Sequence, residues 1–255
     1  MTVHSDNDFG QRFDGMRVAV TGGTSGLGLA LVRELVQRGA RVAFVARTAE
    51  RVQAVARAHR GSVGIVGDVA RKEDIYPIAL QILADLGGLD VLVNSASSLG
   101  PTPLALLADT DCEDVELALA TNVLGPFRLT KALLGALAAS AREGRGSVVL
   151  NVSSDAALNA YPQWGAYGAS KAALHHLSRI WAEELAGDGV RVLSLDPGDM
   201  DTPLHAAAVP DADPATLKRP ETAAREFAEA IAAALPPSQG RAGDVATAAL
   251  HMVSR

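Results

Sequence analysis

A glycine-rich turn between a strand pattern and a helix pattern constrains this chain more than any other feature of its sequence. Residues 17–21 (RVAVT) are a short apolar run typical of a buried strand, and leucines recur every four residues along 26–38, as in an amphipathic helix. The turn between them (TGGTSGLG) has glycines at 22, 26 and 28, which let the backbone approach a ligand closely. Amides at the start of the following helix favour an anion, so the turn predicts a phosphate site; an ordinary glycine-rich turn is the alternative.

Strand and helix patterns alternate along most of the chain. Further strands are expected at 42–46, 62–66, 91–94, 147–152 and 190–195, and further helices at 49–59, 112–141 and 166–186. Strands this apolar, separated by helices, are typical of a parallel sheet covered on both faces. We therefore predict an α/β fold with a doubly wound parallel sheet. It is expected to form one domain over residues 15–255, after a flexible segment at 1–14, with a substrate lid at about 199–225. A seventh strand within 244–252 is left open.

The composition excludes several classes of protein. The 255 residues are 48% hydrophobic and 20% charged, enough to bury a sizeable core. A formal net charge of −6 argues against a nucleic-acid partner, and the single cysteine, Cys112, excludes an intrachain disulfide. No uncharged run suits a membrane span, and residues 1–14 lack the apolar segment of a secretory signal. We expect a cytoplasmic protein without a membrane partner. No metal site is expected either, since the adjacent His175 and His176 point in different directions on a helix.

The residues after the second strand indicate which dinucleotide is bound. In folds that bind dinucleotides, an acidic residue at this position contacts the adenosine ribose hydroxyls. This chain has Ala46 there, followed by Arg47, with Arg51 one turn further on. A guanidinium binds a 2′-phosphate that a carboxylate would repel, so the pattern favours NADP(H) over NAD(H). Glu50 is expected to point to solvent, and a plain solvated Arg47 is the alternative.

Asp68 follows the third predicted strand and has two interpretations. Its carboxylate is placed to accept a hydrogen bond from the adenine amino group of a dinucleotide. Alternatively, it caps the helical segment that begins near Ala70.

A tyrosine and a lysine four residues apart suggest acid–base chemistry. Tyr167 and Lys171 share one face of a helix, so the ammonium is expected to lower the pKa of the phenol from about 10. A general acid that works near neutrality requires such a shift. Many pairs of this kind are merely surface neighbours. Ser154, however, lies just past the fifth strand, at the edge of the sheet where ligands bind in open α/β folds. We therefore predict that the three residues act together.

Asn122 lies in the long helical pattern, four residues before Pro126. Proline has no amide hydrogen, so the carbonyl of Asn122 loses its helical partner and needs another, for which an ordered water is suited. Such a water could feed a proton chain toward Lys171. A simple proline kink with a solvated asparagine is the alternative.

Taken in order, these residues resemble the short-chain dehydrogenases/reductases over residues 17–235. The matching pieces are the TGxxxGxG turn, Asp68, a stretch at Asn94 similar to Asn-Asn-Ala-Gly, and the residues Asn122, Ser154, Tyr167, Lys171, Pro197, Gly198 and Thr202. The resemblance implies a single-domain Rossmann-type fold and an NADP(H)-dependent oxidoreductase of the carbonyl reductase type.

The resemblance also implies residue roles. Tyr167 would be the proton donor and acceptor, Ser154 would orient the substrate carbonyl, Lys171 would bind the nicotinamide ribose, and Asn122 would hold the relay water. The cofactor-binding set is Gly22, Thr24, Ser25, Gly26, Leu27, Gly28, Arg47, Asp68, Val69, Asn94, Tyr167, Lys171, Pro197, Gly198 and Thr202.

The chain departs from the family pattern in three places. The usual Asn-Asn-Ala-Gly is Asn94-Ser95-Ala96-Ser97, and Leu193 stands where many members have asparagine. The last strand lacks its common glycine-rich finish. The first two departures concern the cofactor pocket and the third the oligomer interface.

The sequence therefore predicts reduction of a ketone or aldehyde, or the reverse oxidation, by hydride transfer. The alternative is a non-catalytic NADPH-binding scaffold or sensor on the same fold. Tyr161 and Trp164 suggest an apolar or aromatic small-molecule substrate, although both could be loop packing, and His205 is interpreted as a loop residue. Helices with apolar residues on more than one face, and the family resemblance, suggest a homodimer or homotetramer.

Overall fold

The computed structural model describes residues 12–236, which fold around one parallel sheet. Its strands are β1 (Arg17–Thr21), β2 (Arg41–Ala46), β3 (Ser62–Val66), β4 (Val91–Asn94), β5 (Ser147–Val152) and β6 (Val190–Leu195). They lie in the order β3-β2-β1-β4-β5-β6, every neighbouring pair parallel. This is the order of the doubly wound dinucleotide-binding fold, so the predicted fold class is confirmed.

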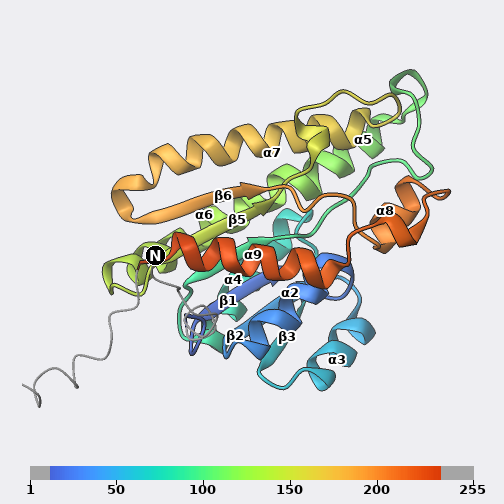
Figure 1. Ribbon diagram of the computed structural model, residues 1–255. Coiled ribbons are helices and arrows are strands. Elements are labelled where there is room, and N and C mark those ends of the chain that lie inside the picture. Colours follow the sequence, from blue (N-terminus) through green and yellow to red (C-terminus); the bar gives the residue numbers. More distant parts are fainter. Residues whose placement is uncertain (1–11, 237–255) are drawn as a thin grey trace, which may run out of the picture.

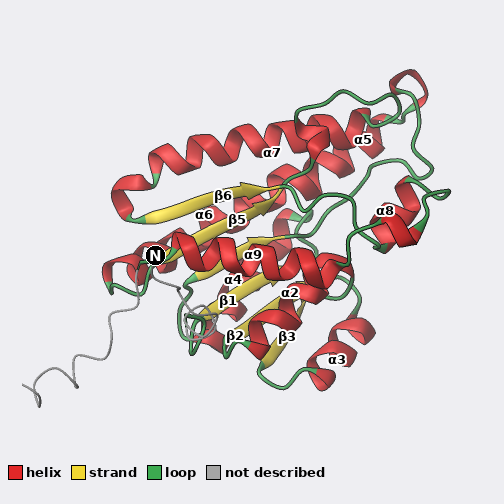
Figure 2. Ribbon diagram, viewed as in Figure 1, coloured by secondary structure: helices red, strands yellow, loops and turns green. Residues whose placement is uncertain are grey.

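Helices cover both faces of the sheet (Figures 1 and 2). One face carries α2 (Gly26–Gln37), α3 (Ala49–Ala58) and α9 (Pro220–Ala234), and the other α4 (Lys72–Leu86), α6 (Gly125–Arg142) and α7 (Gly165–Glu184), with α5 (Cys112–Leu119) beside α7. The short helix α8 (Pro203–Ala208) lies beyond the carboxyl ends of the strands (Figure 1). Single helical turns are η1 (Leu107–Asp109), η3 (Asp155–Ala157), η4 (Ala186–Asp188) and η5 (Pro214–Thr216).

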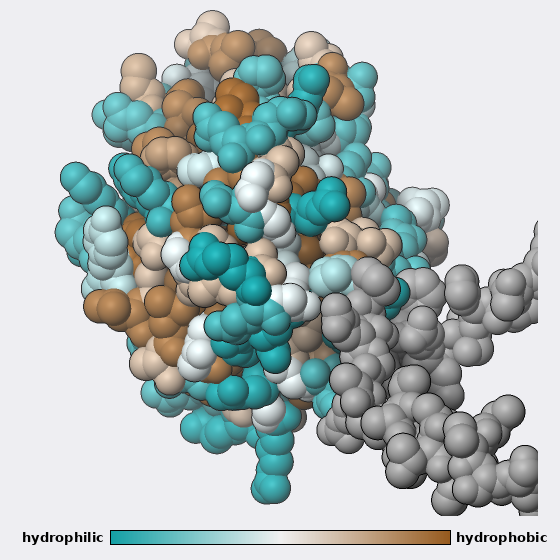
Figure 3. Space-filling view, turned by 90° about the vertical axis from the view of Figure 1, so that its left-hand side faces the viewer, coloured by the Kyte–Doolittle hydropathy of each residue, from teal (hydrophilic) through white to brown (hydrophobic). Residues whose placement is uncertain are grey.

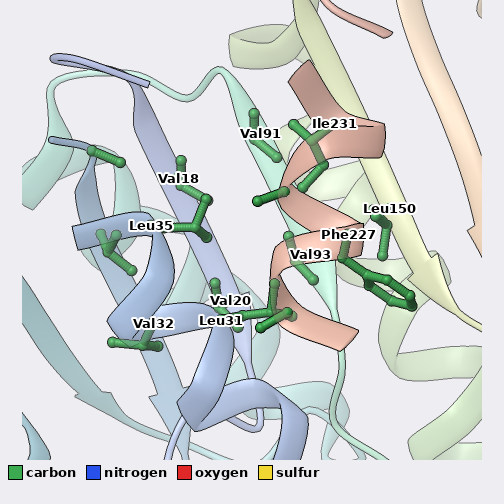
Figure 4. Packing of buried hydrophobic residues seen from close by; sticks show 14 of the residues in the cluster. Val18, Val20, Leu31, Val32, Leu35, Val91, Val93, Leu150, Phe227 and Ile231 are labelled. Atoms are coloured by element: carbon green, nitrogen blue, oxygen red, sulfur yellow. The ribbon is translucent and has the colours of Figure 1, made fainter. Parts of the chain in front are cut away.

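Alternating strand residues supply two separate cores. Val18 and Val20 of β1 pack toward α2 and α9, where they meet Leu31 and Phe227 (Figure 4). Ala19, between them, faces the opposite core under α4 and α6. Since neighbouring side chains of a strand point to opposite faces, this all-apolar strand pattern requires helices on both sides.

A buried carboxylate ties the amino ends of three strands together. Asp90, which is fully buried, accepts hydrogen bonds from the guanidinium groups of Arg17 and Arg145, at 2.5–3.1 Å, and from the hydroxyl of Ser140 at 2.7 Å. These bonds outweigh the cost of burial and hold the pKa of Asp90 well below its usual range. Figure 3 views the molecule from this side, where hydrophilic residues gather over the centre of the face.

The long helix expected at 112–141 is interrupted. A π-helical turn, η2 (Ala120–Leu124), separates α5 from α6 and contains Asn122. Its capping bond runs from the amide of Gly125 to the carbonyl of Ala120, one residue further than in an α-helix. The distortion lies just before Pro126, as the missing proline amide predicts.

The expected chain ends differ from the structure in one respect. Phe13 is fully buried in the core, so the fold begins before residue 15, within the segment that was expected to be flexible. The rest of that segment, residues 1–11, and the possible strand at 244–252 lie outside the described residues.

Candidate active site

A cleft of about 430 Å³ runs along the carboxyl ends of the strands. Loops that follow all six strands contribute to it, together with the start of α8. Ser154, Tyr167 and Lys171 line one part of this cleft, which we call the tyrosine end. The glycine-rich turn lines the same cleft, so residues more than 120 positions apart in the sequence share one site.

The glycine-rich turn leaves no room for side chains at two of its glycines. A Cβ atom at Gly28 would collide with the carbonyl oxygen of Gly22, and one at Gly22, where φ is +74°, would lie 3.0 Å from the backbone of Ala96. The amide of Gly22 donates to the carbonyl of Val45 at 2.8 Å, which fixes the turn against β2. The turn is therefore held open as bare backbone beside the cleft.

Helix α2 begins at Gly26, inside the turn, and its amino terminus borders the cleft. The first amides of a helix have no acceptor within the helix, and the first turn of α2 has no acidic residue. Thr24, Ser25, Gly26, Leu27 and Gly28 all line the cleft. These residues fit an anion such as a pyrophosphate, as predicted from the sequence.

Arg47 and Arg51 line the cleft beside the turn, and both are exposed. Within residues 12–236, neither forms an ion pair or a hydrogen bond. Glu50 is also exposed and does not line the cleft, as expected. The two guanidinium groups are therefore available to an anionic ligand.

The N-cap of α4 is Arg71 and has no side-chain capping bond, so the capping interpretation of Asp68 is wrong, and the adenine contact stays a prediction. The Oδ1 atom of Asp68 accepts from the amide of Ala70 at 2.9 Å, two residues on, which is a turn-stabilising bond ahead of α4. Asp68 also lines the cleft, together with the buried Val69. One carboxylate oxygen of Asp68 thus stabilises the turn before α4, and the residue also lines the cleft.

The contact of Asn94 with the cofactor stays a prediction, and its side chain is not among those that line the cleft. It is buried and donates to the Oδ1 atom of Asn151 at 2.8 Å, which joins β4 to β5. Asn151 in turn donates to Ser178 of α7. Ser95 and Ala96 line the cleft in its place. Leu193 likewise packs against the core under α9 and is not among the lining residues.

Asn122 is fully buried and its side chain is fully engaged. Its oxygen accepts from the amide of Ser98 at 2.8 Å and from the hydroxyl of Ser97 at 3.2 Å. Its nitrogen donates to the carbonyl of Ser98 and to the hydroxyl of Ser170, both at 2.8 Å. Asn122 does not line the cleft itself; it fixes the loop after β4 and joins that loop to α7.

The helix α7 brings Tyr167 and Lys171 to the same face, and both are buried, with 7% and 2% of their surface exposed. The ammonium nitrogen of Lys171 donates to the carbonyl of Val152 at 2.8 Å. It lies over the Tyr167 ring, 5.5 Å from the ring centre. The i, i+4 spacing therefore places the phenol and the ammonium on one face of the helix, as predicted.

The predicted effect of Lys171 on the tyrosine is wrong for this structure. Burial raises the pKa of Tyr167 to about 12, a hydrogen bond with Ser154 lowers it in part, and the charge of Asp196 raises it further. Burial also lowers the pKa of Lys171 to about 8. The prediction omitted desolvation, which disfavours the charged form of both groups and is the largest cause of both pKa shifts.

Ser154 lines the tyrosine end, directly after β5. Its hydroxyl accepts from the amide of Ala156 at 3.2 Å and donates to Asp155 at 3.1 Å. The Ser97 hydroxyl also forms a hydrogen bond that lowers the pKa of Tyr167. Nothing in the sequence pattern singled out Ser97 or Asp155, since both are recognisable only once the loops are placed.

The loop after β6 lines the cleft, with Thr202 beside Gly26 of the glycine-rich turn. Pro197, Gly198 and Thr202 line the cleft as predicted, and the amide of Asp201 donates to the carbonyl of Lys218 at 3.0 Å. This bond closes the loop that carries α8. The expected lid extended to residue 225, but residues from Pro220 onward belong to α9, whose first turns are buried against α2, so the covering segment ends before this helix.

The aromatic residues ahead of α7 pack against one another. The rings of Trp164 and Tyr167 meet edge to face, with 5.6 Å between their centres, and Tyr161 lies 6.4 Å from Trp164. Trp164 lines the cleft, whereas Tyr161 does not and instead donates to Asp155. His205 also lines the cleft, and its Nε2 atom is 3.7 Å from Asp199.

Known proteins share this sequence pattern along most of the chain. A family model described as short chain dehydrogenase matches residues 16–213. The L-fucose dehydrogenase of Bos taurus is 32% identical over 248 residues, which cover 96% of this chain and 85% of that protein. The 2-(R)-hydroxypropyl-CoM dehydrogenase of Xanthobacter autotrophicus is 34% identical over 194 residues, 74% of this chain and 76% of its own. The chain belongs to the short-chain dehydrogenase family.

Solved structures of similar proteins agree with this short-chain dehydrogenase in fold. A 3-ketoacyl-(acyl-carrier-protein) reductase from Brucella melitensis, in complex with NADH, has a TM-score of 0.79 and 25% identity, covering 88% of this chain and 92% of its own. A short-chain dehydrogenase from Shigella flexneri, in complex with NADP, has a TM-score of 0.77 and 26% identity. The match covers 83% of this chain and 88% of that protein.

The described part of this short-chain dehydrogenase has neither a membrane-spanning helix nor a cluster of metal-ligating side chains. None of the helices in residues 12–236 is long and apolar enough to cross a membrane. Over the same residues, His, Cys, Asp and Glu side chains form no group of three or more that would hold a metal ion.

Proposed function

We propose that this short-chain dehydrogenase interconverts a carbonyl compound and an alcohol with NADP(H), and that Tyr167 transfers the proton. The observation that carries the proposal is that one cleft is lined by bare glycine backbone, by two arginines without an ion pair in residues 12–236, and by the buried Tyr167 and Lys171. A binding module would need the first two features only. The third supplies a proton donor beside the ligand space.

The residues present fit a nicotinamide dinucleotide. The turn at Gly22 and Gly28, where a Cβ would collide with backbone, and the amino terminus of α2 would hold the pyrophosphate. Arg47 and Arg51 would bind a 2′-phosphate, which favours NADP(H) over NAD(H). Relatives in complex with NADP and with NADH support the cofactor class. The remaining contacts are assigned to Asp68, Val69, Lys171, Pro197, Gly198 and Thr202.

When bound, the reduced nicotinamide supplies a hydride to the carbonyl carbon. With a pKa of about 12, Tyr167 keeps its proton at neutral pH and can donate it to the oxygen that becomes negative. Ser154 orients that oxygen with its hydroxyl. Because the phenol is protonated at neutral pH, the free protein is ready to act as the acid of the reduction, and the same path in reverse oxidises an alcohol.

Lys171 acts after Tyr167 has donated its proton, when the tyrosine is a phenolate. A pKa of about 8 leaves Lys171 mostly charged at pH 7, and its ammonium lies over the Tyr167 ring, where it stabilises a phenolate. Reprotonation through a water held by the Asn122 carbonyl stays a prediction, and the π-helical turn at that residue is the feature that supports it.

The substrate is assigned an apolar body, because Leu99, Trp164 and Leu204 line the cleft. A homodimer or homotetramer is proposed from exposed apolar residues on the helices of one side, Leu117, Leu124 and Ile180. A cytoplasmic location stays a prediction.

A panel of aryl and alkyl ketones with NADPH tests the proposed function, since the loss of reduced-cofactor absorbance reports turnover. Ketone-dependent oxidation of NADPH supports it. Tight NADPH binding with no oxidation across the panel would favour the scaffold or sensor alternative instead.

A further inference from the structure

Asp155 is a fixed carboxylate at the tyrosine end of the cleft. It follows Ser154 directly, accepts from the Ser154 hydroxyl at 3.1 Å, and accepts from the Tyr161 hydroxyl at 2.7 Å. Its two oxygens are therefore each held by a different partner. An aspartate held in this way presents its remaining lone pairs in a defined direction, although its side chain stands at the surface.

No cation neutralises this carboxylate within residues 12–236, where Asp155 has no ion pair. Asp196 and Asp199 line the same region, and Asp196 is also without an ion pair. The charges of Asp196 and Asp155 both raise the pKa of Tyr167, which places them within electrostatic reach of the phenol. Lys171 is the buried cation nearby, and its ammonium donates to the Val152 carbonyl.

Negative charge around a reacting carbonyl has a consequence for substrate choice. A substrate with a carboxylate or phosphate next to its carbonyl would be repelled, whereas a hydroxyl or an ammonium there gains a charge-assisted hydrogen bond. The apolar lining residues Leu99, Trp164 and Leu204 then receive the rest of the molecule.

We propose that the cleft selects carbonyl compounds with a hydrogen-bond donor, hydroxyl or ammonium, on the carbon next to the carbonyl, and that Asp155 determines this specificity. The inference rests on the proposed carbonyl reduction and names its substrate class. Hydroxyl and ammonium substituents have in common that they donate a hydrogen bond. The experiment compares the neutral hydroxyl with the charged ammonium.

Four phenyl ketones that differ only beside the carbonyl form the test set: acetophenone, 2-hydroxyacetophenone, 2-aminoacetophenone and phenylglyoxylate. Because these groups also change the reactivity of the carbonyl, each kcat/KM is compared between the wild type and Asp155→Asn for the same ketone. In the variant, kcat/KM is expected to fall by about tenfold to a hundredfold for the two ketones that carry a donor and by less for acetophenone. For phenylglyoxylate, kcat/KM is expected to rise. The hydroxyl and amino arms show which donor is preferred.

Asp211→Asn is the matched control, because it removes an exposed carboxylate that does not line the cleft. This variant is expected to change kcat/KM by similar factors for all four ketones. A structural role of Asp155, acting only through Ser154, would lower all four rates equally and leave their ratios unchanged. Equal factors in Asp155→Asn would therefore overturn the inference while leaving carbonyl reduction intact.

A binding measurement separates this inference from the proposed function. Calorimetry with NADP⁺-loaded protein compares 1-phenylethanol, 1-phenyl-1,2-ethanediol, 2-amino-1-phenylethanol and mandelate. Stronger binding of the diol or amino alcohol, lost in Asp155→Asn, supports the inference even if no ketone is turned over. Equal binding of all four, or preference for mandelate, contradicts it.

Discussion

The ammonium nitrogen of Lys171 lies over the ring of Tyr167, 5.5 Å from its centre, and both side chains are buried. One turn of α7 brings them together, and the protein removes both from water. Burial raises the pKa of the phenol to about 12 and lowers that of the ammonium to about 8. At neutral pH the phenol is therefore protonated and the ammonium is still mostly charged, so a proton donor and a positive charge lie side by side in the cleft.

Removing the buried ammonium is expected to alter how stability depends on pH. An unfolded chain holds the Lys171 proton up to about pH 10.5 and the folded chain only to about pH 8, so unfolding takes up a proton between these values. The free energy of unfolding therefore gains a contribution as pH rises through this window, by roughly 3 kcal/mol for a fully buried group. Lys171→Met is expected to lack that rise in urea titrations at pH 7.5–10.

Lys131→Met is the control for this prediction, because Lys131 is an exposed residue of α6. It is expected to keep the rise of the wild type. Parallel pH profiles for the wild type and Lys171→Met would show that the lysine has nearly the same pKa folded and unfolded, and would contradict the shift caused by burial.

Arg47→Ala is expected to weaken NADPH binding by about tenfold to a hundredfold and NADH binding by less than about threefold, because only NADPH carries the 2′-phosphate. Fluorescence titration of the reduced cofactors measures both. Arg57→Ala is the matched control, since Arg57 is an exposed arginine of α3 that does not line the cleft. Equal losses for NADPH and NADH in Arg47→Ala would remove Arg47 from phosphate recognition.

Asp90→Asn is expected to lower the free energy of unfolding by about 3–5 kcal/mol at neutral pH, because Arg17 and Arg145 lose their shared buried partner. The folded pKa of Asp90 is depressed, so its stabilisation is present above the usual carboxyl pKa and disappears as the pH falls through the folded value. The difference between wild type and variant should therefore narrow under strong acid.

Glu143→Gln serves as the comparison for Asp90, since this side chain is 58% exposed and 3.7 Å from Arg17. Its expected effect is below about 1 kcal/mol. Similar losses of unfolding free energy in Asp90→Asn and Glu143→Gln would mean that burial of the carboxylate does not determine how much its ion pairs stabilise the fold.

The sequence predicted all six strands and the helices α2, α3 and α7, because strands buried on both faces are uniformly apolar and the turn at 21–28 lies between a strand and a helix. It did not predict α4, α8 or α9, and it merged α5 and α6 into one helix. The i, i+4 pair of α7 and the distortion before Pro126 followed from local geometry alone. The assignment of Asn94 to the ligand came from the family pattern, which does not show that its side chain joins two strands.

The reversed pKa shift of Tyr167 has a different origin. Desolvation depends on every atom that covers a group, and around Tyr167 those atoms come from separate segments, among them Leu99 after β4, Ala156 of η3 and Ala207 of α8. Asp155 and Ser97 were missed for the same reason, since their positions near the phenol depend on how distant loops fold. Spacing along one helix carries no information on these contacts.

The most direct test of the account combines cofactor binding and turnover in Tyr167→Phe. The variant keeps the ring and its packing but has no proton to donate, so it is expected to bind NADPH within about threefold of the wild type. Its kcat for ketone reduction should fall by about 10²–10⁴-fold. NADPH titration and ketone-dependent loss of absorbance measure the two quantities on one sample. Normal binding with turnover lost is the predicted result, and a variant that reduces ketones at nearly the wild-type rate would contradict the account.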